Sequence, residues 1–592
     1  MDASIQKAVD RWLGDPAIAD PDKQDIHVLL EGGEQEELAD RFYRCLEFGT
    51  GGMRGLIGAG TNRVNLYTIG AAAQGLADYI GQQGDAAKQA GVAIAYDCRR
   101  MSPQFAERTA LVLAGNGIGA YLFERLRPTP QLSFAVRQLG CTAGVVITAS
   151  HNPPQYNGFK VYGSDGGQIT PPHDRAIMER VAGVESFSDI KLMGRADAER
   201  VGLLNHLGRE VDEAFLAATQ SSCLNPDLCR AQGDRLKIVY TSLHGTGGTL
   251  APEALRRRGF IQTLEVPEQA VPDGEFSTVE SPNPEEGAAL KMGIELAKIE
   301  RAGLVIGTDP DADRMGIAVR DRDGQYELVS GNRIGALLCY YICEELTRQD
   351  RFPDNAVVLS TVVSGDLMKK IARSYGAQVE ETLTGFKWIG HAIRRYEQQG
   401  TADKPSKTFI FGAEESYGYL PVTFARDKDA ITSTAFIAET AAWAASRGKT
   451  LLDVLNELFA RFGYHHEAAK SMVLPGKSGA ERIKAIMERL RTDPPAELGG
   501  CKVGSMTDYL TGQSTDLMAG QTLPAPTGYD LPAANVLTFN LVEGGKVIAR
   551  PSGTEPKIKF YILLVEGDAD GAEKRATDKA RSIIAQLERL AG

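Results

Sequence analysis

A hydroxyl, an imidazole and an ammonium come close together where one apolar run of this sequence ends. The run Val145-Val146-Ile147 predicts a buried strand of a parallel sheet, because short β-branched runs bounded by turn residues are typical of such strands. Two prolines follow, so no regular helix begins there, and Ser150 is expected at the rim of the sheet, where open α/β sheets bind ligands. His151 and Lys160 lie within reach of its hydroxyl. The plainer alternative is a capping serine in a polar turn.

Three aspartates alternate further along the chain, at Asp309, Asp311 and Asp313. An extended backbone would point all three carboxylates the same way. Carboxylates so placed repel one another unless a cation neutralises them, and hard oxygen ligands suit Mg²⁺. A calcium EF-hand does not fit, because Arg314 and Arg320 stand where that loop needs glycine and glutamate. The alternative without a metal is a solvated acidic turn.

Two more segments offer hydrogen-bond donors for an anion. The segment from Phe48 to Gly55 surrounds Arg54 with glycines, which brings a guanidinium and backbone N–H groups together, although a plain glycine turn would read the same way. The segment from Arg550 to Lys557 combines a guanidinium, two hydroxyls and an ammonium, which are the donors that a phosphate dianion needs.

A glycine-rich segment from His244 to Gly248 follows a predicted strand and could suggest dinucleotide binding. Its spacing is not G-x-G-x-x-G, and no acidic residue follows at the expected place. Nucleotide binding is therefore discounted.

The composition indicates a soluble globular protein with several domains. The chain has 592 residues, of which 24% are charged and 43% apolar, and its net charge of -12 argues against general nucleic-acid binding. The first residues lack the features of a signal peptide, and no apolar stretch approaches the roughly 20 residues of a membrane span. The eight cysteines form no C-x-x-C pair, so neither a disulfide framework nor a zinc site is indicated. We expect a cytoplasmic protein.

A pattern of strand, helix, strand, helix and strand occurs three times, and each third strand ends in one of the unusual loops. We therefore expect an α/β protein with three consecutive βαβ-type mixed-sheet domains and a smaller C-terminal α+β domain around a central cleft. The expected boundaries are 1–47 for an N-terminal helical extension, 48–215 for the domain of the serine loop, 216–330 for that of the aspartate loop, 331–455 for that of a GAEESYG loop, and 456–592 for the last domain.

Four loops carry a resemblance to a known family: the serine loop, the aspartate loop, the GAEESYG loop at residues 412–418 and the loop at residues 550–557. Together they resemble the motifs of the α-D-phosphohexomutases, the phosphoglucomutase and phosphomannomutase family, and most resemble its long phosphoglucomutase and phosphopentomutase type. The resemblance runs from about Phe48 to the end, with one motif in each domain. It implies a phosphoserine at Ser150 and one Mg²⁺ per chain, with Ser150, Asp309, Asp311 and Asp313 as the metal ligands.

The same resemblance implies the other site residues. Besides Ser150, the expected catalytic residues are Arg54, His151 and Lys160. The expected substrate-binding residues are Arg314, Thr384, Gly385, Lys387, Glu414, Ser416, Lys428, Arg550, Ser552, Gly553, Thr554 and Lys557.

The activity implied by the resemblance is that of an isomerase that transfers a phosphoryl group within its substrate. We expect a phosphoglucomutase that interconverts glucose 1-phosphate and glucose 6-phosphate through glucose 1,6-bisphosphate, which is intermediate and activator. Phosphomannomutase, phosphopentomutase, hexose-bisphosphate synthase and a catalytically idle relative are the alternatives, the last disfavoured because every motif residue is present. The expected partners are small sugar phosphates, with no nucleic acid and no membrane, and the expected state is a monomer or weak homodimer.

Overall fold

The computed structural model describes residues 2–49, 52–401, 404–474, 476–525, 532–552, 557–567 and 570–591. Gly553 and Thr554 of the predicted phosphate loop lie outside these residues. The chain divides into two compact units: unit 1 is Met1–Gly331, Gly385–Ser406 and Ser416–Gly448, and unit 2 is Asn332–Thr384, Lys407–Glu415 and Lys449–Gly592.

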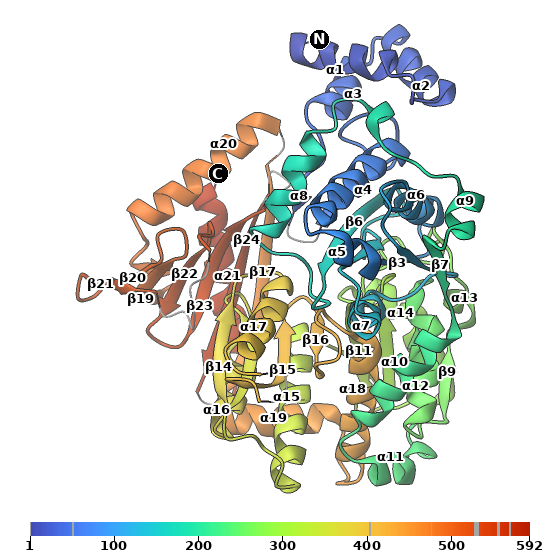
Figure 1. The fold of residues 1–592 in the computed structure, drawn as a ribbon. Helices are drawn as coiled ribbons and strands as arrows, with labels where there is room; N and C mark the ends of the chain where they lie inside the picture. Colours follow the sequence, from blue (N-terminus) through green and yellow to red (C-terminus); the bar gives the residue numbers. More distant parts are fainter. Residues whose placement is uncertain are drawn as a thin grey trace. The chain divides into compact units, whose positions relative to one another are not determined.

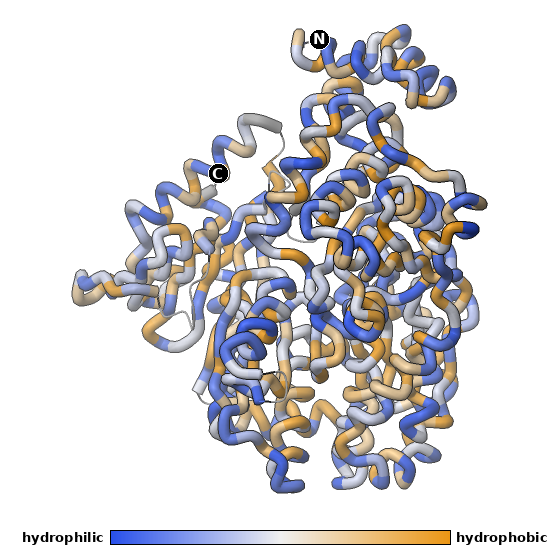
Figure 2. The backbone as a smooth tube through the Cα atoms, viewed as in Figure 1, coloured by the Kyte–Doolittle hydropathy of each residue, from blue (hydrophilic) through white to orange (hydrophobic). Residues whose placement is uncertain are grey.

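Unit 1 begins with three helices, α1 (Ala3–Gly14), α2 (Asp20–Glu31) and α3 (Gln35–Phe42). Hydrophobic and hydrophilic residues alternate along them (Figure 2), as in helices that bury one face. The buried face centres on Trp12, whose ring meets Phe42, Tyr67 and Phe187 edge-on at centroid distances of 5.9, 5.4 and 5.6 Å. The N-terminal segment is therefore packed onto the first sheet domain.

The first sheet of unit 1 has the strand order β1-β2-β6-β5-β3-β4-β7, in which β5, β3, β4 and β7 are parallel and β6, β2 and β1 antiparallel. Its strands are β1 (Phe48–Gly49), β2 (Gly52–Leu56), β3 (Val92–Tyr96), β4 (Ala120–Phe123), β5 (Ala143–Ile147), β6 (Tyr156–Gly163) and β7 (Leu204–Leu207). Its helices are α4 (Leu66–Gly81), α5 (Asp85–Ala90), α6 (Ser102–Gly115), α7 (Thr129–Leu139), α8 (His173–Ala182) and α9 (Arg195–Arg200).

Both faces of this sheet are covered (Figure 1), so its central strands carry apolar residues on both sides. In β5, Val145 and Ile147 pack in the core with α4 and α6, while Val146 packs in the core with α7. The predicted buried strand before Ser150 is confirmed.

The second sheet of unit 1 has the order β12-β11-β10-β8-β9, with β8, β9 and β10 parallel. Its strands are β8 (Ile238–Thr241), β9 (Thr263–Glu265), β10 (Leu304–Thr308), β11 (Met315–Arg320) and β12 (Tyr326–Val329), and its helices are α10 (Arg209–Ser221), α11 (Pro226–Gly233), α12 (Ala251–Arg257), α13 (Pro267–Ala270) and α14 (Gly287–Glu300). The aspartate segment connects β10 to the antiparallel strand β11.

Three later elements complete unit 1: α17 (Lys387–Gln398), β16 (Gly418–Leu420) and α18 (Ala430–Ala445). Helix α18 is buried from Ala430 to Ala444, and its Glu439 forms an unexposed ion pair with Arg258. Asp429 caps the helix by accepting a hydrogen bond of 2.8 Å from the backbone N–H of Thr432.

Unit 2 contains the parallel strands β14, β13 and β15 and the antiparallel C-terminal sheet, in the order β17-β24-β23-β22-β19-β20-β21. Its first elements are α15 (Gly331–Arg348), β13 (Ala356–Thr361), α16 (Leu367–Ser374), β14 (Gln378–Thr382), β15 (Thr408–Glu414) and α19 (Leu451–Phe462). The C-terminal elements are β17 (Tyr464–Val473), α20 (Gly476–Thr492), β18 (Glu497–Leu498), β19 (Cys501–Asp508), β20 (Gln513–Asp516), β21 (Gln521–Pro524), β22 (Leu537–Leu541), β23 (Gly545–Pro551), β24 (Lys557–Glu566) and α21 (Ala572–Ala591).

The predicted class, three mixed α/β domains and a smaller α+β domain, is confirmed. Val362 and Val363, which follow β13, share one core with Ile548 and Tyr561 of the C-terminal sheet and with Val536, which precedes β22. The four domain boundaries and the central cleft stay predictions.

In the described part of the chain, no helix is both long enough and apolar enough to cross a membrane.

Candidate active site

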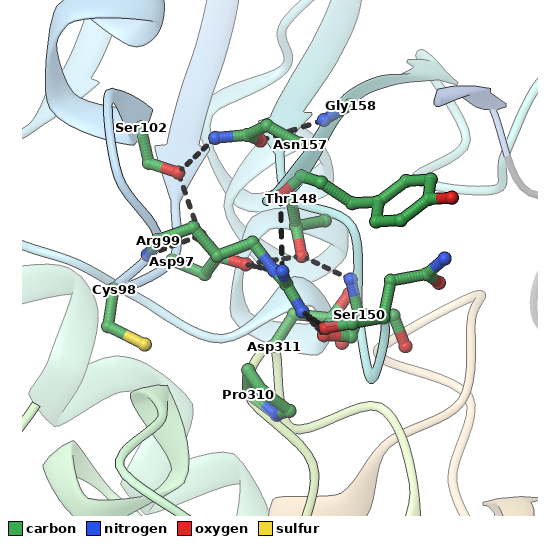
Figure 3. A network of polar contacts seen from close by, with 12 residues as sticks. Asp97, Cys98, Arg99, Ser102, Thr148, Ser150, Asn157, Gly158, Pro310 and Asp311 are labelled. Carbon is green, nitrogen blue, oxygen red and sulfur yellow. Dashed lines mark hydrogen bonds and ion pairs between the residues drawn. The ribbon is translucent and has the colours of Figure 1, made fainter. Parts of the chain in front are cut away.

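Ser150 follows β5 as predicted, but it is not exposed. Only 2% of the residue is accessible, and its backbone has a φ of +52°, which is uncommon for a residue with a side chain. Its Oγ donates a hydrogen bond of 2.6 Å to Oδ2 of Asp309 and lies 3.2 Å from Nδ1 of His151 (Figure 3 shows the serine and its surroundings). Because the hydroxyl has one proton and Asp309 receives it, the imidazole can only donate to this oxygen in the same arrangement.

The aspartate segment is a turn, which corrects the predicted extended backbone. The N–H of Ala312 bonds to the carbonyl of Asp309 at 2.9 Å, and the φ of Ala312 is +50°. The prediction that the carboxylates converge is confirmed by another route: one carboxylate oxygen each of Asp309, Asp311 and Asp313 lies within 4.8 Å of the others. Oδ1 of Asp309 stabilises the turn by accepting the N–H groups of Asp313 and Arg314, both at 3.0 Å.

Two lysines reach this aspartate cluster from different elements. Nζ of Lys160, on β6, lies 2.7 Å from Oδ2 of Asp311 and 3.2 Å from Oδ2 of Asp313. Nζ of Lys428 lies 3.3 Å from the same Asp313 oxygen. Burial lowers the pKa of Lys160, but the two carboxylates outweigh that effect and raise its pKa above the ordinary value, so Lys160 is an ammonium here.

Burial and the neighbouring charges of Asp311 and Asp313 raise the pKa of Asp309 well above its ordinary value. Burial together with the guanidinium groups of Arg314 and Arg54 holds the pKa of His151 well below its ordinary value, so its imidazole is neutral near pH 7. The site therefore combines crowded carboxylates with one neutral imidazole.

The two predicted arginines flank the serine loop and the aspartate turn. Nη1 of Arg54 donates to Oδ1 of Asn152 at 2.5 Å, two residues after Ser150. Nη1 of Arg314 is 2.5 Å from Oε1 of Glu285. Unit 1 thus brings together Ser150, His151, Lys160, Arg54, Arg314, Lys428 and the three aspartates.

Three family models match this chain: phosphoglucomutase/phosphomannomutase alpha/beta/alpha domain I at residues 46–187, domain II at 213–324 and domain III at 330–462. A phosphoglucomutase of Staphylococcus aureus strain USA300 is 38% identical over 533 residues, which are 90% of this chain and 92% of the relative. A phosphoglucomutase of Staphylococcus haemolyticus strain JCSC1435 is 37% identical over 586 residues, 98% of this chain and 100% of the relative. The chain belongs to the phosphoglucomutase/phosphomannomutase family.

Two solved structures have the same fold. A putative phosphomannomutase from Thermus thermophilus aligns with a TM-score of 0.66 at 22% identity, over 92% of this chain and 99% of that one. The open form of Paramecium parafusin, a phosphoglucomutase, aligns with a TM-score of 0.68 at 18% identity, over 92% of this chain and 94% of that one. The predicted α-D-phosphohexomutase family is confirmed, and the chain is a mutase of the isomerase class.

Residues outside the predicted set support the candidate site. Thr129, at the start of α7, donates from its backbone N–H to the carbonyl of Asp311 at 2.9 Å and from Oγ1 to Oδ2 of Asp311 at 3.0 Å. Tyr162 donates at 2.8 Å to Oδ2 of Asp427, whose neighbour is Lys428. These are single polar residues in ordinary helix and strand patterns, so nothing in the sequence marks them.

The glycine-rich segment after β8 has a structural task beside the candidate site. Thr246 donates from its N–H at 2.8 Å and from Oγ1 at 2.9 Å to the carbonyl of Pro310, between the first two aspartates. A Cβ on Gly245 would lie 2.4 Å from the Cα of Pro310, so only glycine allows this approach. The segment therefore supports the aspartate turn, which gives its glycines a role that does not involve a nucleotide.

The remaining predicted residues fall in both units. In unit 1, Gly385 has a φ of +111° and Ser416 precedes β16. Nζ of Lys387 lies 3.9 Å from Oδ2 of Asp174, and burial lowers the pKa of Lys387. In unit 2, Thr384 has a buried hydroxyl, and Glu414 ends β15. Arg550 donates to the hydroxyl of Tyr561 at 3.5 Å, and the N–H of Ser552 bonds to the carbonyl of Lys557 at 2.7 Å. Their roles stay predictions.

The aspartate cluster fits a hard divalent cation. Oδ1 of Asp311 and Oδ1 of Asp313 are buried and, in the described structure, have no hydrogen-bond partner. Buried carboxylate oxygens without a donor are costly unless a ligand satisfies them. Three converging carboxylates beside a serine oxygen form an all-oxygen ligand set of the kind that Mg²⁺ prefers.

Proposed function

We propose that this mutase interconverts glucose 1-phosphate and glucose 6-phosphate by way of a phosphorylated Ser150 and glucose 1,6-bisphosphate. The observation that carries the proposal is the contact of 2.6 Å between Oγ of Ser150 and Asp309, inside a cluster that also holds an ammonium. A serine oxygen fixed against converging carboxylates is placed for phosphoryl transfer, which depends mainly on positioning and charge neutralisation.

Asp309, Asp311, Asp313 and Ser150 would hold one Mg²⁺, which when bound neutralises negative charge on the transferring group and on the serine oxygen. This chain's own residues have separate tasks. Arg54, through Asn152, and His151 border the serine and can orient a phosphate beside it.

Transfer from phosphorylated Ser150 breaks the bond between phosphorus and Oγ and forms one to the free hydroxyl of the sugar. A proton must pass from that hydroxyl to the serine oxygen as the phosphoryl group passes the other way. We assign this relay to Lys160, whose Nζ is held as an ammonium 2.7 Å from Asp311. The ammonium gives a proton to the departing serine oxygen, and the amine that remains takes the proton of the sugar hydroxyl, which restores the ammonium. The bisphosphate then returns its other phosphoryl group to Ser150 by the reverse of these bond changes.

Glucose is proposed as the sugar because relatives named phosphoglucomutase match nearly the whole chain at 37 and 38% identity. A coupled assay should compare the 1-phosphates of glucose, mannose, ribose and glucosamine, each with and without glucose 1,6-bisphosphate. The highest kcat/KM is expected for glucose 1-phosphate, with activation by the bisphosphate. A higher kcat/KM for another sugar would contradict the glucose assignment. A cytoplasmic location and a monomeric or weakly dimeric state stay predictions.

The Ser150→Ala variant tests the phosphoserine. Turnover is expected to fall at least about 10⁴-fold, because the acceptor and donor oxygen is removed. Intact-mass measurement should find a phosphate on the wild-type chain that is absent from the variant. Ser221→Ala is the control, because Ser221 is an exposed serine on α10. Wild-type turnover in Ser150→Ala would end the proposal.

Arg550 is proposed to hold the phosphate of the substrate that does not react at Ser150. Because the same phosphate-binding residue would serve both orientations of the bisphosphate, Arg550→Ala should lower kcat/KM for glucose 1-phosphate and glucose 6-phosphate alike. One charge-assisted hydrogen bond corresponds to about 1.5 to 3 kcal/mol, or roughly 10- to 150-fold. Release of free bisphosphate should rise as well. A loss confined to one of the two substrates would contradict this role.

A further inference from the structure

Four backbone carbonyls of the serine loop converge on one buried side chain, that of Arg99. Its Nη2 donates to the carbonyl of Ser150 and to that of Asn152, both at 2.5 Å. Its Nη1 donates to the carbonyls of Pro153 and Tyr156 at 2.8 and 3.1 Å. The Arg99 side chain is fully buried. One guanidinium therefore holds the loop from its first residue to the start of β6, and its planar fork of five donors suits this arrangement better than any other side chain.

The opposite side of Ser150 is held by the same group of residues (Figure 3). The backbone N–H of Ser150 donates to Oγ1 of Thr148 at 2.8 Å, and Thr148 donates in turn to Oδ2 of Asp97 at 2.6 Å. That Asp97 oxygen lies 3.2 Å from Nε of Arg99. The contacts close into a ring that runs from the N–H of Ser150 through Thr148, Asp97 and Arg99 back to the carbonyl of Ser150.

This ring accounts for the unusual backbone of Ser150. A φ of +52° costs free energy in a residue with a side chain, so it persists only where the surroundings impose it. Fixing the N–H on one side and the carbonyl on the other imposes it here. The result is the direction of the side chain, which places Oγ 2.6 Å from Asp309.

Arg99 and Asp97 are themselves fixed on their other sides. Oδ1 of Asp97 accepts the N–H of Arg99 at 3.0 Å and the hydroxyl of Ser102 at 2.8 Å. The guanidinium carbon of Arg99 lies 4.9 Å from the centre of the Phe276 ring, which covers it. Arg99 and Asp97 are thus held in place by contacts on both sides of the ring.

We propose that Arg99 is a positioning residue for phosphoryl transfer: through the ring with Asp97 and Thr148 it holds Ser150 in the strained backbone conformation that aims its oxygen at the aspartate cluster. The inference rests on the proposed function only for its kinetic part. The ordering of the loop is a separate physical claim that can be measured without substrate.

The test compares Arg99→Lys with Arg100→Lys in the full-length enzyme. Lysine keeps the charge but lacks the fork, so it cannot reach all four carbonyls. Arg100 is the matched control, because its side chain is exposed and pairs with Glu275, away from the carbonyls that Arg99 holds. Two readouts are taken: amide hydrogen exchange of residues 148–156, and kcat and KM measured separately.

In Arg99→Lys, exchange of residues 148–156 is expected to be at least about tenfold faster, while β3 and β5 exchange as in the wild type. The kcat should fall about 100-fold with KM within about twofold, because a displaced oxygen impairs transfer more than binding. Arg100→Lys should match the wild type in both readouts. Unchanged loop exchange, unchanged kcat, or a loss that lies in KM would overturn the proposal.

Thr148 gives a second test that does not depend on how well Arg99→Lys folds. Thr148→Val keeps the shape but breaks the ring, and it should show the same faster loop exchange and lower kcat; Thr148→Ser restores the hydroxyl and should recover most of both. If Thr148→Val and Thr148→Ser had the same loop exchange and the same kcat, the ring would not be what orders the loop, and the proposal would be wrong. If Ser150→Ala instead retained turnover, the phosphoserine proposal would fail while the exchange results still decided whether Arg99 orders the loop.

Discussion

Each unit of the chain holds a cluster of opposite charges, and the two clusters are balanced differently. In unit 1, the three aspartates outnumber Lys160 and Lys428, and Arg314 beside them is itself paired with Glu285. In unit 2, two lysines meet two carboxylates. Lys369 contacts Asp366 at 2.9 Å and also Glu381, while Lys546 contacts the same two residues at 3.3 and 3.6 Å.

The difference separates the proposed metal site of unit 1 from the ion cluster of unit 2. In the described part of the chain, the unit 1 cluster has buried carboxylate oxygens without a hydrogen-bond partner. Asp366 and Glu381 of unit 2 have no such unpartnered buried oxygen. In unit 1, burial and the neighbouring carboxylates raise the pKa of Asp309, while Lys428 and Lys160 lower that of Asp313. In unit 2, the lysines overcome the effect of burial and lower the pKa of both Asp366 and Glu381. Excess negative charge in unit 1 is what the proposed Mg²⁺ would neutralise, whereas opposite charges are matched in unit 2.

Among the changes that test this comparison of the two units, Asp311→Asn in unit 1 should have the largest effect. The amide keeps the shape of the side chain but removes a negative charge, so Mg²⁺ affinity should fall at least tenfold and kcat about 100- to 1,000-fold. Stability should not fall, because repulsion among the aspartates is relieved. Calorimetric Mg²⁺ titration, steady-state kinetics and urea unfolding measure the three quantities.

Asp323→Asn is the control for that change, since Asp323 is an exposed acid in the turn between β11 and β12. It should leave Mg²⁺ affinity and kcat unchanged. Full activity of the wild type after chelation by EDTA, or a stability loss in Asp311→Asn as large as the kinetic loss, would show that the unit 1 cluster is a structural one.

A smaller effect, of the opposite kind, is expected from Lys369→Met in unit 2. Removing one partner of an ion cluster typically costs about 3 to 5 kcal/mol when the cluster is fully buried, and about 2 to 3 kcal/mol is expected here because the two carboxylates are partly exposed. Urea unfolding should show the loss, while Mg²⁺ affinity stays at the wild-type value.

The exposed Lys484→Met on α20 serves as the control for stability. The double variant Lys369→Met with Glu381→Leu should be more stable than Lys369→Met alone, since Lys546 and Asp366 then remain as a matched pair. A double variant that is less stable than either single variant would mean that the balance of charge is not what stabilises unit 2.

Much of this organisation could be predicted from residue pattern. The strands before the three loops were predicted because β-branched runs such as Val145-Val146-Ile147 report burial on both faces of a sheet. Convergence of the aspartates was predicted for the wrong reason, since the segment turns at Ala312 and is not extended. Local spacing could not show the turn, because hydrogen bonds to Oδ1 of Asp309 and support from Thr246 create it.

What the sequence did not predict are contacts between residues far apart in the chain. Ser150 was expected at the rim of the sheet, and it is buried there because Asp309 and Arg99 reach it from other elements. The matched cluster of unit 2 was also missed, because Lys546 lies 180 residues after Asp366. Single charged residues in different elements show no periodicity, so only the folded chain brings them together.

The smallest effect concerns acid, and it should separate the two units. Burial lowers the pKa of His465, on β17 of unit 2, from 6.5 to about 4. The imidazole of His465 is therefore protonated more readily in the unfolded chain than in the folded one. Its contribution to stability is complete above about pH 6.5 and is lost as pH falls towards 4. Between pH 7.5 and 5 the loss is at most about 2 kcal/mol. In unit 1, burial lowers the pKa of His151 with the same consequence in acid. The raised pKa of Asp309 acts with the opposite sign and offsets that loss, because protonation of Asp309 favours the folded form.

Hydrogen exchange at pH 7.5 and 5, corrected for its intrinsic pH dependence, should therefore show loss of protection in β17 and β24 and a smaller loss in β3 and β5. Burial also lowers the pKa of His466 on β17, so His465→Asn removes one of two such groups and should retain part of the unit 2 protection at pH 5. His27→Asn, at an exposed position on α2, should behave as the wild type. The lowered pKa values of Asp366 and Glu381 lie in a lower pH range, so they do not account for a loss above pH 5. Equal loss of protection in both units, or an unchanged acid response in His465→Asn, would show that the two units do not differ in how their buried charges respond to protons.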